Sequence, residues 1–248
     1  MANRFLIAPD FSPERFAGWH LLNNLLQKRA NLAIHLNTPA SHAEQEELIE
    51  SGDIKIVYAN PFDAAKMIRE QGYRAIVRPV GKSNEMVVTS SVNSDIKTLD
   101  DVKAGMTIAM ANNRDVKLIG MRLLEAVDLT ENDVKFEIVD TYQAAARLLI
   151  QDKAQVAFFI AEVFAGLSNL TKSQLNILIQ SDIATLTHVV LVKDDFADAE
   201  KLQEVLLSLD KDDDGKAVLK ELGLESGFEV MSEEDAEFMI DLMETLLD

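Results

Sequence analysis

Short apolar runs alternate with longer amphipathic segments along the whole chain. In the first third, the apolar runs at residues 5–8, 33–36 and 55–58 have the length and composition of buried strands. The segments between them repeat apolar residues every three or four positions, which is the spacing of one helix face. Strands that alternate with helices in this way predict a parallel sheet covered by helices.

Capping residues mark where the first helices begin. Ser12 followed by Pro13 predicts the start of a helix that extends to about Arg29, because serine is a favoured cap and proline is tolerated in the first turn. Ser41 predicts the cap of a second, acidic helix that ends at about Glu50. The predicted apolar face of the first helix comprises Phe16, Trp19, Leu22, Leu25 and Leu26.

The alternation restarts after an extended segment, which predicts a second lobe. The chain is expected to cross between the lobes near residues 80–90 and to return near residues 181–190. The fold class predicted is α/β, with two lobes that each contain a helix-covered, mostly parallel sheet, and with a cleft between the lobes. The predicted lobes are residues 1–85 with 190–248, and residues 86–189. Later strands are predicted at 106–110, 136–139, 156–159, 175–178 and 188–192, and helices at 112–126, from 141, from 161, and at 198–209, 216–222 and 232–247.

Composition narrows the possible function classes. The chain has 248 residues, of which 48% are apolar, and a formal net charge of −18. That charge disfavours binding to nucleic acid or to an anionic membrane surface. No run approaches the ~18 uncharged apolar residues that a membrane-spanning helix needs, so no membrane insertion is expected. The chain has no cysteine, which excludes disulfides, thiol catalysis and thiolate metal sites.

Neither a catalytic motif nor a secretion signal is recognisable. The four histidines lack metal-site spacing, and neither G-x-S-x-G nor a P-loop occurs. The chain is therefore predicted not to be an enzyme and to use no cofactor. Its first residues do not form a signal peptide, because a short apolar run is followed at once by Pro9. The expected location is the periplasm if Met1 was added to a processed chain, and otherwise the cytoplasm.

An ordered set of segments resembles one family. The segments are Tyr-Ala-Asn-Pro-Phe at 58–62, Gly-Tyr-Arg-Ala-Ile-Val-Arg-Pro-Val at 72–80, the stretch 94–105 with its following strand, and the Gly-containing stretch 214–223. Their order and spacing are similar to those of the phosphate/phosphonate-type substrate-binding proteins of ABC transporters, which have the type 2 periplasmic-binding-protein fold. The resemblance implies a two-lobed protein that binds a small-molecule ligand and serves an ABC transporter membrane component or a sensor protein.

The family usually presents a Ser/Thr-rich loop at the start of a second-lobe helix, where hydroxyl and N–H groups hold the phosphonate. Here that loop runs from Asn112 to Asp115. Arg114 could pair an anion bidentately. Asp115 would repel an anion, and as the helix cap it would occupy the free N–H donors. If Asp10, Asp115 and Glu162 all face the cleft, a zwitterionic or aminated ligand becomes more plausible than phosphate.

Ligands of such folds bind at the carboxyl ends of the strands. Several of the residues nominated by this rule have a structural alternative: Tyr58 as core, Asn60 as a turn residue, Thr141 as a helix cap and His188 as a packed histidine. The predicted ligand-binding residues are Asp10, Tyr58, Asn60, Phe62, Asn112, Asn113, Arg114, Asp115, Thr141, Tyr142, Glu162 and His188.

An acidic stretch matches a calcium-loop pattern. Asp210, Asp212, Asp214 and Gly215, with Glu221 at the twelfth position, follow the D-x-D-x-D-G-x5-E spacing. However, the residues after the glycine continue as an amphipathic helix, so an acidic turn between two helices is favoured over a calcium site. No metal site is predicted.

Two functions remain open from the sequence. The first is a solute-binding protein that closes by hinge motion over a small polar ligand, with a phosphate- or phosphonate-like anion favoured, for transport or sensing. The alternative is a cytoplasmic enzyme or sensory domain built on the same fold, with a changed or degenerate ligand site.

Overall fold

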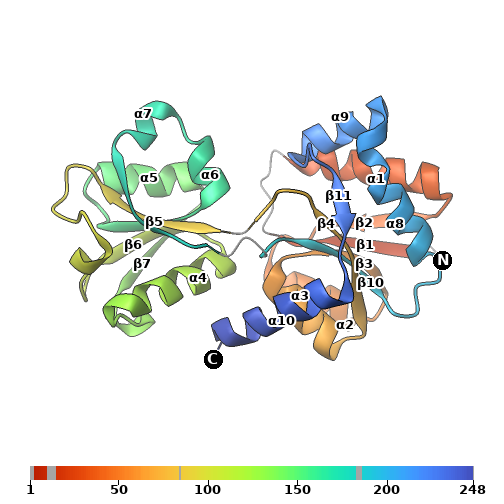
Figure 1. The fold of residues 1–248 in the computed structure, drawn as a ribbon, viewed down its shortest axis with the longest axis horizontal. Helices are drawn as coiled ribbons and strands as arrows, with labels where there is room; N and C mark the ends of the chain where they lie inside the picture. The colour runs from red at the N-terminus through yellow and green to blue at the C-terminus, as the bar shows by residue number, and fades with distance from the viewer. Residues whose placement is uncertain (1–2, 10–14, 84, 183–185, 248) are drawn as a thin grey trace. The chain divides into compact units, whose positions relative to one another are not determined.

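The chain folds into two compact units (Figure 1). The computed structural model describes residues 3–9, 15–83, 85–182 and 186–247. Unit 1 comprises Met1–Lys82 and Thr187–Thr245, and unit 2 comprises Ser83–Leu186 and Leu246–Asp248. Each unit has its own sheet and its own helices, and each is described separately below.

Unit 1 contains a six-stranded mixed sheet in the order β11-β4-β10-β3-β1-β2. Its strands are β1 (Asn3–Ile7), β2 (Ile34–Asn37), β3 (Ile54–Ala59), β4 (Tyr73–Pro79), β10 (Val189–Lys193) and β11 (Phe228–Val230). Pairings of β1 with β2 and β3 are parallel, whereas β10 is antiparallel to both β3 and β4. The first four strands therefore run in one direction, and β10, inserted between two of them, runs in the other. The parallel strands expected from the first third of the sequence are therefore confirmed, and the antiparallel β10 makes the complete sheet mixed.

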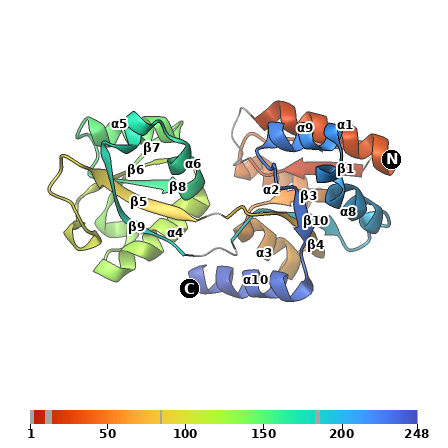
Figure 2. The ribbon, with the colours of Figure 1, turned by 45° about the horizontal axis from the view of Figure 1, so that its top comes forward.

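Helices cover both faces of the unit 1 sheet (Figure 2). They are α1 (Phe16–Ala30), α2 (His42–Glu50), α3 (Pro61–Glu70), α8 (Ala199–Leu207), α9 (Asp213–Leu222) and α10 (Glu233–Leu247). Helices α1, α8 and α9 lie on one face, and α3 and α10 lie on the other. Ser41 caps α2 as predicted, because its side chain accepts a hydrogen bond from the Glu44 N–H. The predicted helix start at Ser12 and Pro13 lies outside the described residues.

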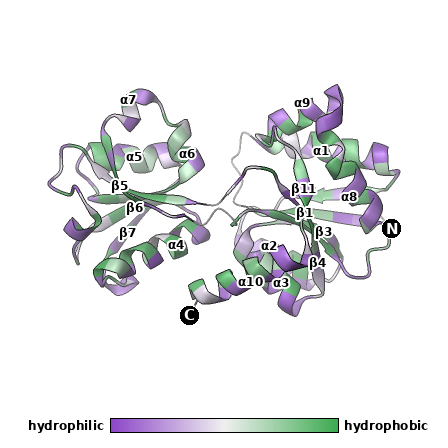
Figure 3. Cartoon of the chain, in the orientation of Figure 1, coloured by the Kyte–Doolittle hydropathy of each residue, from purple (hydrophilic) through white to green (hydrophobic). Residues whose placement is uncertain are grey.

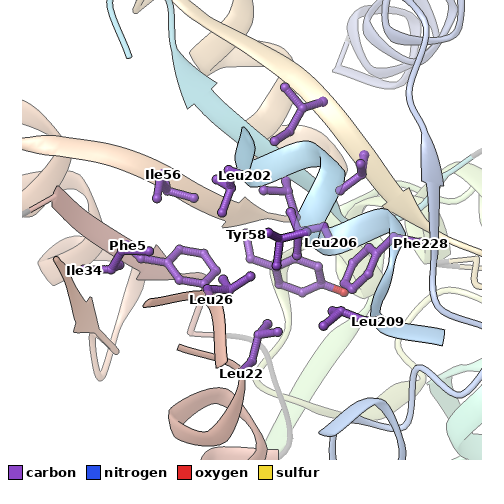
Figure 4. Packing of buried hydrophobic residues seen from close by; sticks show 14 of the residues in the cluster. Phe5, Leu22, Leu26, Ile34, Ile56, Tyr58, Leu202, Leu206, Leu209 and Phe228 are labelled. Atoms are coloured by element: carbon purple, nitrogen blue, oxygen red, sulfur yellow. The ribbon is translucent and has the colours of Figure 1, made fainter. Parts of the chain in front are cut away.

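A hydrophobic core cluster lies between the unit 1 sheet and helices α1, α8 and α9 (Figure 4). Trp19, Leu22 and Leu26 of α1 are buried in it, in agreement with the predicted apolar face. The prediction that Phe16 belongs to this buried face is wrong, because Phe16 is the first residue of the helix and is 47% exposed. Figure 3 shows how apolar and polar residues are distributed: the strands inside are mostly apolar, and the helices combine polar and apolar faces.

Unit 2 contains a five-stranded mixed sheet in the order β7-β6-β8-β5-β9. Its elements are β5 (Met86–Ser91), β6 (Thr107–Ala111), α4 (Arg114–Leu124), β7 (Lys135–Val139), α5 (Tyr142–Ile150), β8 (Val156–Ile160), α6 (Ala161–Gly166), α7 (Asn169–Lys172) and β9 (Leu175–Gln180). Strand β6 is parallel to β7 and β8, while β5 is antiparallel to β8 and β9. The segment β5, expected to be part of the crossing, is thus a paired strand of this sheet. The two helix-covered, mixed sheets confirm the predicted α/β class.

The acidic stretch that matched a calcium loop is a turn between two helices. A short 3-10 helix at Leu209–Lys211 precedes α9, and Asp212 caps α9 by accepting a hydrogen bond from the Gly215 N–H at 2.9 Å. Asp212 also pairs with Arg29 of α1 at 2.6 Å. The regular helix from Asp213 onward confirms the prediction of an acidic turn between two helices. Within the described residues, no group of three or more acidic or histidine side chains is arranged to hold a metal ion.

Asp212→Ala is expected to lower the free energy of unfolding by about 1 kcal/mol, because it removes the side-chain acceptor at the start of α9. Thermal unfolding with and without millimolar calcium measures both effects. The variant is expected to unfold at a lower temperature than wild type, and for each protein the unfolding temperature in calcium should equal that in a chelator. If calcium raised the unfolding temperature of the wild type but not that of Asp212→Ala, the stretch would have to be interpreted as a calcium site.

Candidate functional site

In unit 1 the candidate site is the edge where β1, β2 and β3 end. These strands are parallel, so their carboxyl ends share one edge, and helices α1, α2 and α3 begin beside it. Tyr58 lies near the end of β3, and His188 directly precedes β10. Asp10, also predicted here, lies outside the described residues.

An aromatic stack occupies this edge. The rings of Tyr58 and His188 are stacked, with centroids 5.1 Å apart and an interplanar angle of 17°. On the other side, Trp19 of α1 packs against Tyr58 with centroids 4.6 Å apart. Tyr58 and Trp19 are buried, while His188 is partly exposed. The stack therefore connects the helix-covered core to the strand edge through Tyr58, and His188 is its most exposed member. Trp19 was expected only as a core residue, and no sequence motif indicates that it contacts Tyr58.

Asn60 and Phe62 begin helix α3 in this unit. The Asn60 side chain caps α3 by accepting from the Asp63 N–H at 2.8 Å, and its amide nitrogen donates to Asp63 Oδ2 at 3.0 Å. Gln45 of α2 donates to the same carboxylate oxygen at 2.6 Å. Both ends of the Asn60 amide thus hold bonds within the chain, and Phe62 is buried. These contacts fix α2 and α3 at the strand edge, and nothing in the sequence marks Gln45 as part of this network.

In unit 2 the candidate site is the edge where β6, β7 and β8 end. The three strands run in the same direction, so helices α4, α5 and α6 all begin at that edge. Helix starts present backbone N–H groups that lack partners within the helix, together with partial positive charge. This edge therefore combines three positive helix ends within a single unit.

Asn113, and not Asp115, caps helix α4. Asn113 Oδ1 accepts from the Val116 N–H at 3.1 Å. Asp115 follows in the first turn and is only 4% exposed, so the expectation that it caps the helix is wrong. A buried acidic side chain in a first turn is favoured by the helix dipole. Asparagine and aspartate are both strong caps, and their spacing in the sequence does not distinguish them.

Arg114 is the exposed cation of this loop. Its side chain is exposed at the first residue of α4, beside exposed Asn112. Within the described part of the chain, the Arg114 guanidinium makes no ion pair or side-chain hydrogen bond. An arginine in this position can offer several N–H donors to an oxyanion at the helix start.

The remaining predicted residues lie at the starts of α5 and α6. Thr141 caps α5 by accepting from the Ala144 N–H at 3.1 Å, as the structural alternative proposed. Tyr142 follows it, with its ring 6.0 Å from that of buried Phe159 on β8. Glu162 is exposed in the first turn of α6. The structure thus brings all the predicted ligand-binding residues of unit 2, from Asn112 to Glu162, to one edge of one sheet.

Comparisons with known proteins agree with this architecture. Residues 5–236 match the family described as ABC transporter, phosphonate, periplasmic substrate-binding protein. The chain belongs to this family. No curated protein matches it in sequence.

Solved structures share the fold at low sequence identity. XAC2383 from Xanthomonas citri, bound to chloride ion, has a TM-score of 0.82 at 13% identity, covering 100% of this chain and 99% of that one. PhnD1 from Prochlorococcus marinus, in complex with methylphosphonate, has a TM-score of 0.80 at 14% identity, covering 99% and 98%. The periplasmic aliphatic sulphonate binding protein SsuA from Escherichia coli has a TM-score of 0.67 at 16% identity, covering 99% and 91%. The expected two-lobed, periplasmic-binding-protein fold is therefore confirmed.

The family consists of substrate-binding proteins of ABC transporters, which bind solutes and are not enzymes. Such proteins normally work in the periplasm with membrane transporter components. None of the helices in the described residues is long and apolar enough to cross a membrane.

Proposed function

We propose that this chain binds a small tetrahedral oxyanion, such as a phosphonate, and closes over it by hinge motion to present it to a transporter or sensor. The single observation that carries the choice of an anion is Arg114. It is an exposed cation without a partner in the described part of the chain, at the start of α4, where β6, β7 and β8 end. The adjacent helix starts add partial positive charge.

The chemistry of the structural neighbours supports the same ligand class. PhnD1 was solved with methylphosphonate, and SsuA is named for aliphatic sulphonates. Both ligands combine a tetrahedral, negatively charged head with a small organic group.

Removing the Arg114 charge is expected to weaken oxyanion binding about tenfold to a hundredfold, the effect of losing one charge-assisted hydrogen-bonding group. The test is a thermal-shift titration of wild type and Arg114→Ala with phosphate, methylphosphonate, aminoalkylphosphonates and alkanesulfonates. A ligand that binds only the folded state stabilises it by about 2.7 kcal/mol at a hundredfold excess over its dissociation constant.

The matched control is Arg147→Ala, which removes an exposed arginine from the last turn of α5 in the same unit. It should leave every titration unchanged. A ligand that stabilises wild type and Arg114→Ala equally would remove Arg114 from the site. No shift with any oxyanion would favour the alternative of a protein of this fold with a changed or degenerate ligand site.

A further inference from the structure

A small cavity lies in unit 1 between helices α2 and α3. Its volume is about 30 Å³. A cavity of about 10–15 Å³ is enough to hold one water-sized particle, so this one can hold a water molecule or a small ion. The polar residues that line it are Gln45, Glu46 and Glu50 from α2, and Asp63, Lys66 and Gln71 from α3 and its end.

Hydrogen bonds fix the orientation of the Gln45 amide in this lining. Gln45 Nε2 donates to Asp63 Oδ2 at 2.6 Å, and the opposite orientation would set an amide oxygen against a carboxylate oxygen. Asn60 Nδ2 donates to the same oxygen at 3.0 Å, while Asn60 Oδ1 accepts from the Asp63 N–H at 2.8 Å. The Asp63 carboxylate is therefore the acceptor of both amides, and Gln45 Oε1 is the amide atom that faces away from it.

Gln45 Oε1 is a buried acceptor that no described residue satisfies. Gln45 is 2% exposed, and within the described part of the chain no N–H or O–H group donates to this oxygen. The same holds for Oε1 of Gln71, the residue that ends α3. Buried polar atoms are paired in the great majority of cases, with the protein or with a bound particle. Two such acceptors in one lining therefore indicate a particle that binds to oxygen atoms.

The charges around the cavity favour a cation over a water molecule. Among the described residues of the lining, Glu46, Glu50 and Asp63 carry carboxylates and Lys66 carries an ammonium group. Lys66 lies 3.7 Å from Glu46. Asp63 Oδ2 receives its hydrogen bonds from neutral amides, and His42 Nδ1 lies 3.7 Å from it. A positive ion is attracted by this excess of negative charge, whereas a water molecule gains much less.

The kind of ligands favours a monovalent ion. Amide and carboxylate oxygens suit hard cations, and calcium sites reach high affinity by combining several carboxylates. Here Glu46 and Glu50 are exposed, which leaves two amide oxygens and the carboxylate of Asp63 as the more buried ligands. In agreement, no group of three or more acidic or histidine side chains among the described residues is arranged to hold a metal ion.

We propose that this cavity is a binding site for a monovalent cation, sodium or potassium. The Oε1 atoms of Gln45 and Gln71 and the carboxylate of Asp63 bind the ion, which links α2 to the end of α3. Both helices begin at the strand edge of unit 1, so the ion stabilises the part of the unit that borders this edge. The site is separate from Arg114 in unit 2, and its test does not depend on oxyanion binding.

Thermal unfolding of the full chain in sodium, potassium and choline chloride at equal ionic strength tests the site. Choline is too large for the cavity, so it reports only the screening that any salt provides to a chain with a net charge of −18. Sodium or potassium should raise the unfolding temperature further and in a saturable way. The expected difference from choline is about 3–6 °C at a tenfold excess over the dissociation constant.

Gln71→Met keeps the length of the side chain but removes one ligand, so it should lose most of this cation-specific rise. The matched control is Gln151→Met, because Gln151 ends α5 in unit 2 as Gln71 ends α3. The control should keep the whole rise. Lys66→Gln removes a positive charge from the lining, so the half-maximal effect should come at a several-fold lower cation concentration.

Crystals soaked in rubidium or thallium salts locate the ion directly. We expect an anomalous peak beside Gln45 Oε1 in the wild type and none there in Gln71→Met. A cavity that contains only a water molecule would overturn the proposal. So would a rise in unfolding temperature that sodium, potassium and choline share equally, or one that Gln71→Met retains in full.

Discussion

Gly215→Ala is expected to lower the free energy of unfolding by about 3 kcal/mol, because added volume in a rigid, packed position forces backbone shifts. A Cβ atom at Gly215 would lie 2.0 Å from the Leu209 carbonyl oxygen and 2.7 Å from its carbon. These are backbone atoms of the preceding 3-10 helix, which cannot rotate away. The glycine that completed the calcium-loop pattern is therefore required by the close packing of the turn.

Chemical denaturation monitored by circular dichroism measures this change. Gly166→Ala is the matched control, because a Cβ atom at Gly166 of α6 would meet no atom within 4 Å. The control should unfold within about 1 kcal/mol of wild type, the range set by helix propensity alone. Equal stability of Gly215→Ala and the control would show that the turn before α9 is looser than the structure indicates.

Gly120→Ala is expected to destabilise the protein by about 1–3 kcal/mol even though alanine is the better helix former. Gly120 lies in α4, and a Cβ atom there would come within 2.3 Å of the Phe158 ring. Phe158 belongs to β8 and is fully buried, so either the ring or the helix must move. A moved α4 would also displace Arg114 at its start, and oxyanion binding should weaken together with stability.

A second substitution distinguishes this clash from other causes. Phe158→Leu leaves a smaller side chain beneath Gly120, so the double variant should be more stable than the sum of the two single changes predicts. Strict additivity in chemical denaturation would mean that Gly120 and Phe158 do not compete for the same space.

The alternation of strands and helices was predictable because each element carries its own local pattern. Apolar runs identified β1, β2 and β3, and Ser41 and Thr141 marked the helix starts that they cap. The insertion of β10 between β3 and β4 was not predictable in this way, because strand order depends on packing between distant segments. The pairing of β5 was not predictable for the same reason. Its residues were expected to form an extended crossing between the lobes, but they pair with β8 on one side and β9 on the other.

The candidate site was predictable in position but less so in detail. The rule that ligands bind where parallel strands end brought Asn112, Arg114 and Glu162 to one edge of unit 2. It could not show that Asn113 is the cap and that Asp115 is buried, because both residue types favour helix starts. Nor could it find Gln45, whose contact with Asp63 joins two helices through side chains alone.

Shared fold at 13–16% identity also limits what can be transferred from the structural neighbours. At that level the backbone plan is retained while individual side chains have been replaced, so ligand identity depends on this chain's own residues. The start of α4 is the clearest case, since Asn113 caps the helix and Arg114 is its exposed cation.

Isothermal titration calorimetry of the wild type with methylphosphonate measures oxyanion binding itself. We expect saturable binding with one site per chain, weakened in Arg114→Ala and unchanged in Arg147→Ala. Absence of binding heat across several temperatures, for methylphosphonate as well as for phosphate and methanesulfonate, would contradict it. The fold would then be that of a substrate-binding protein whose site recognises a different class of ligand.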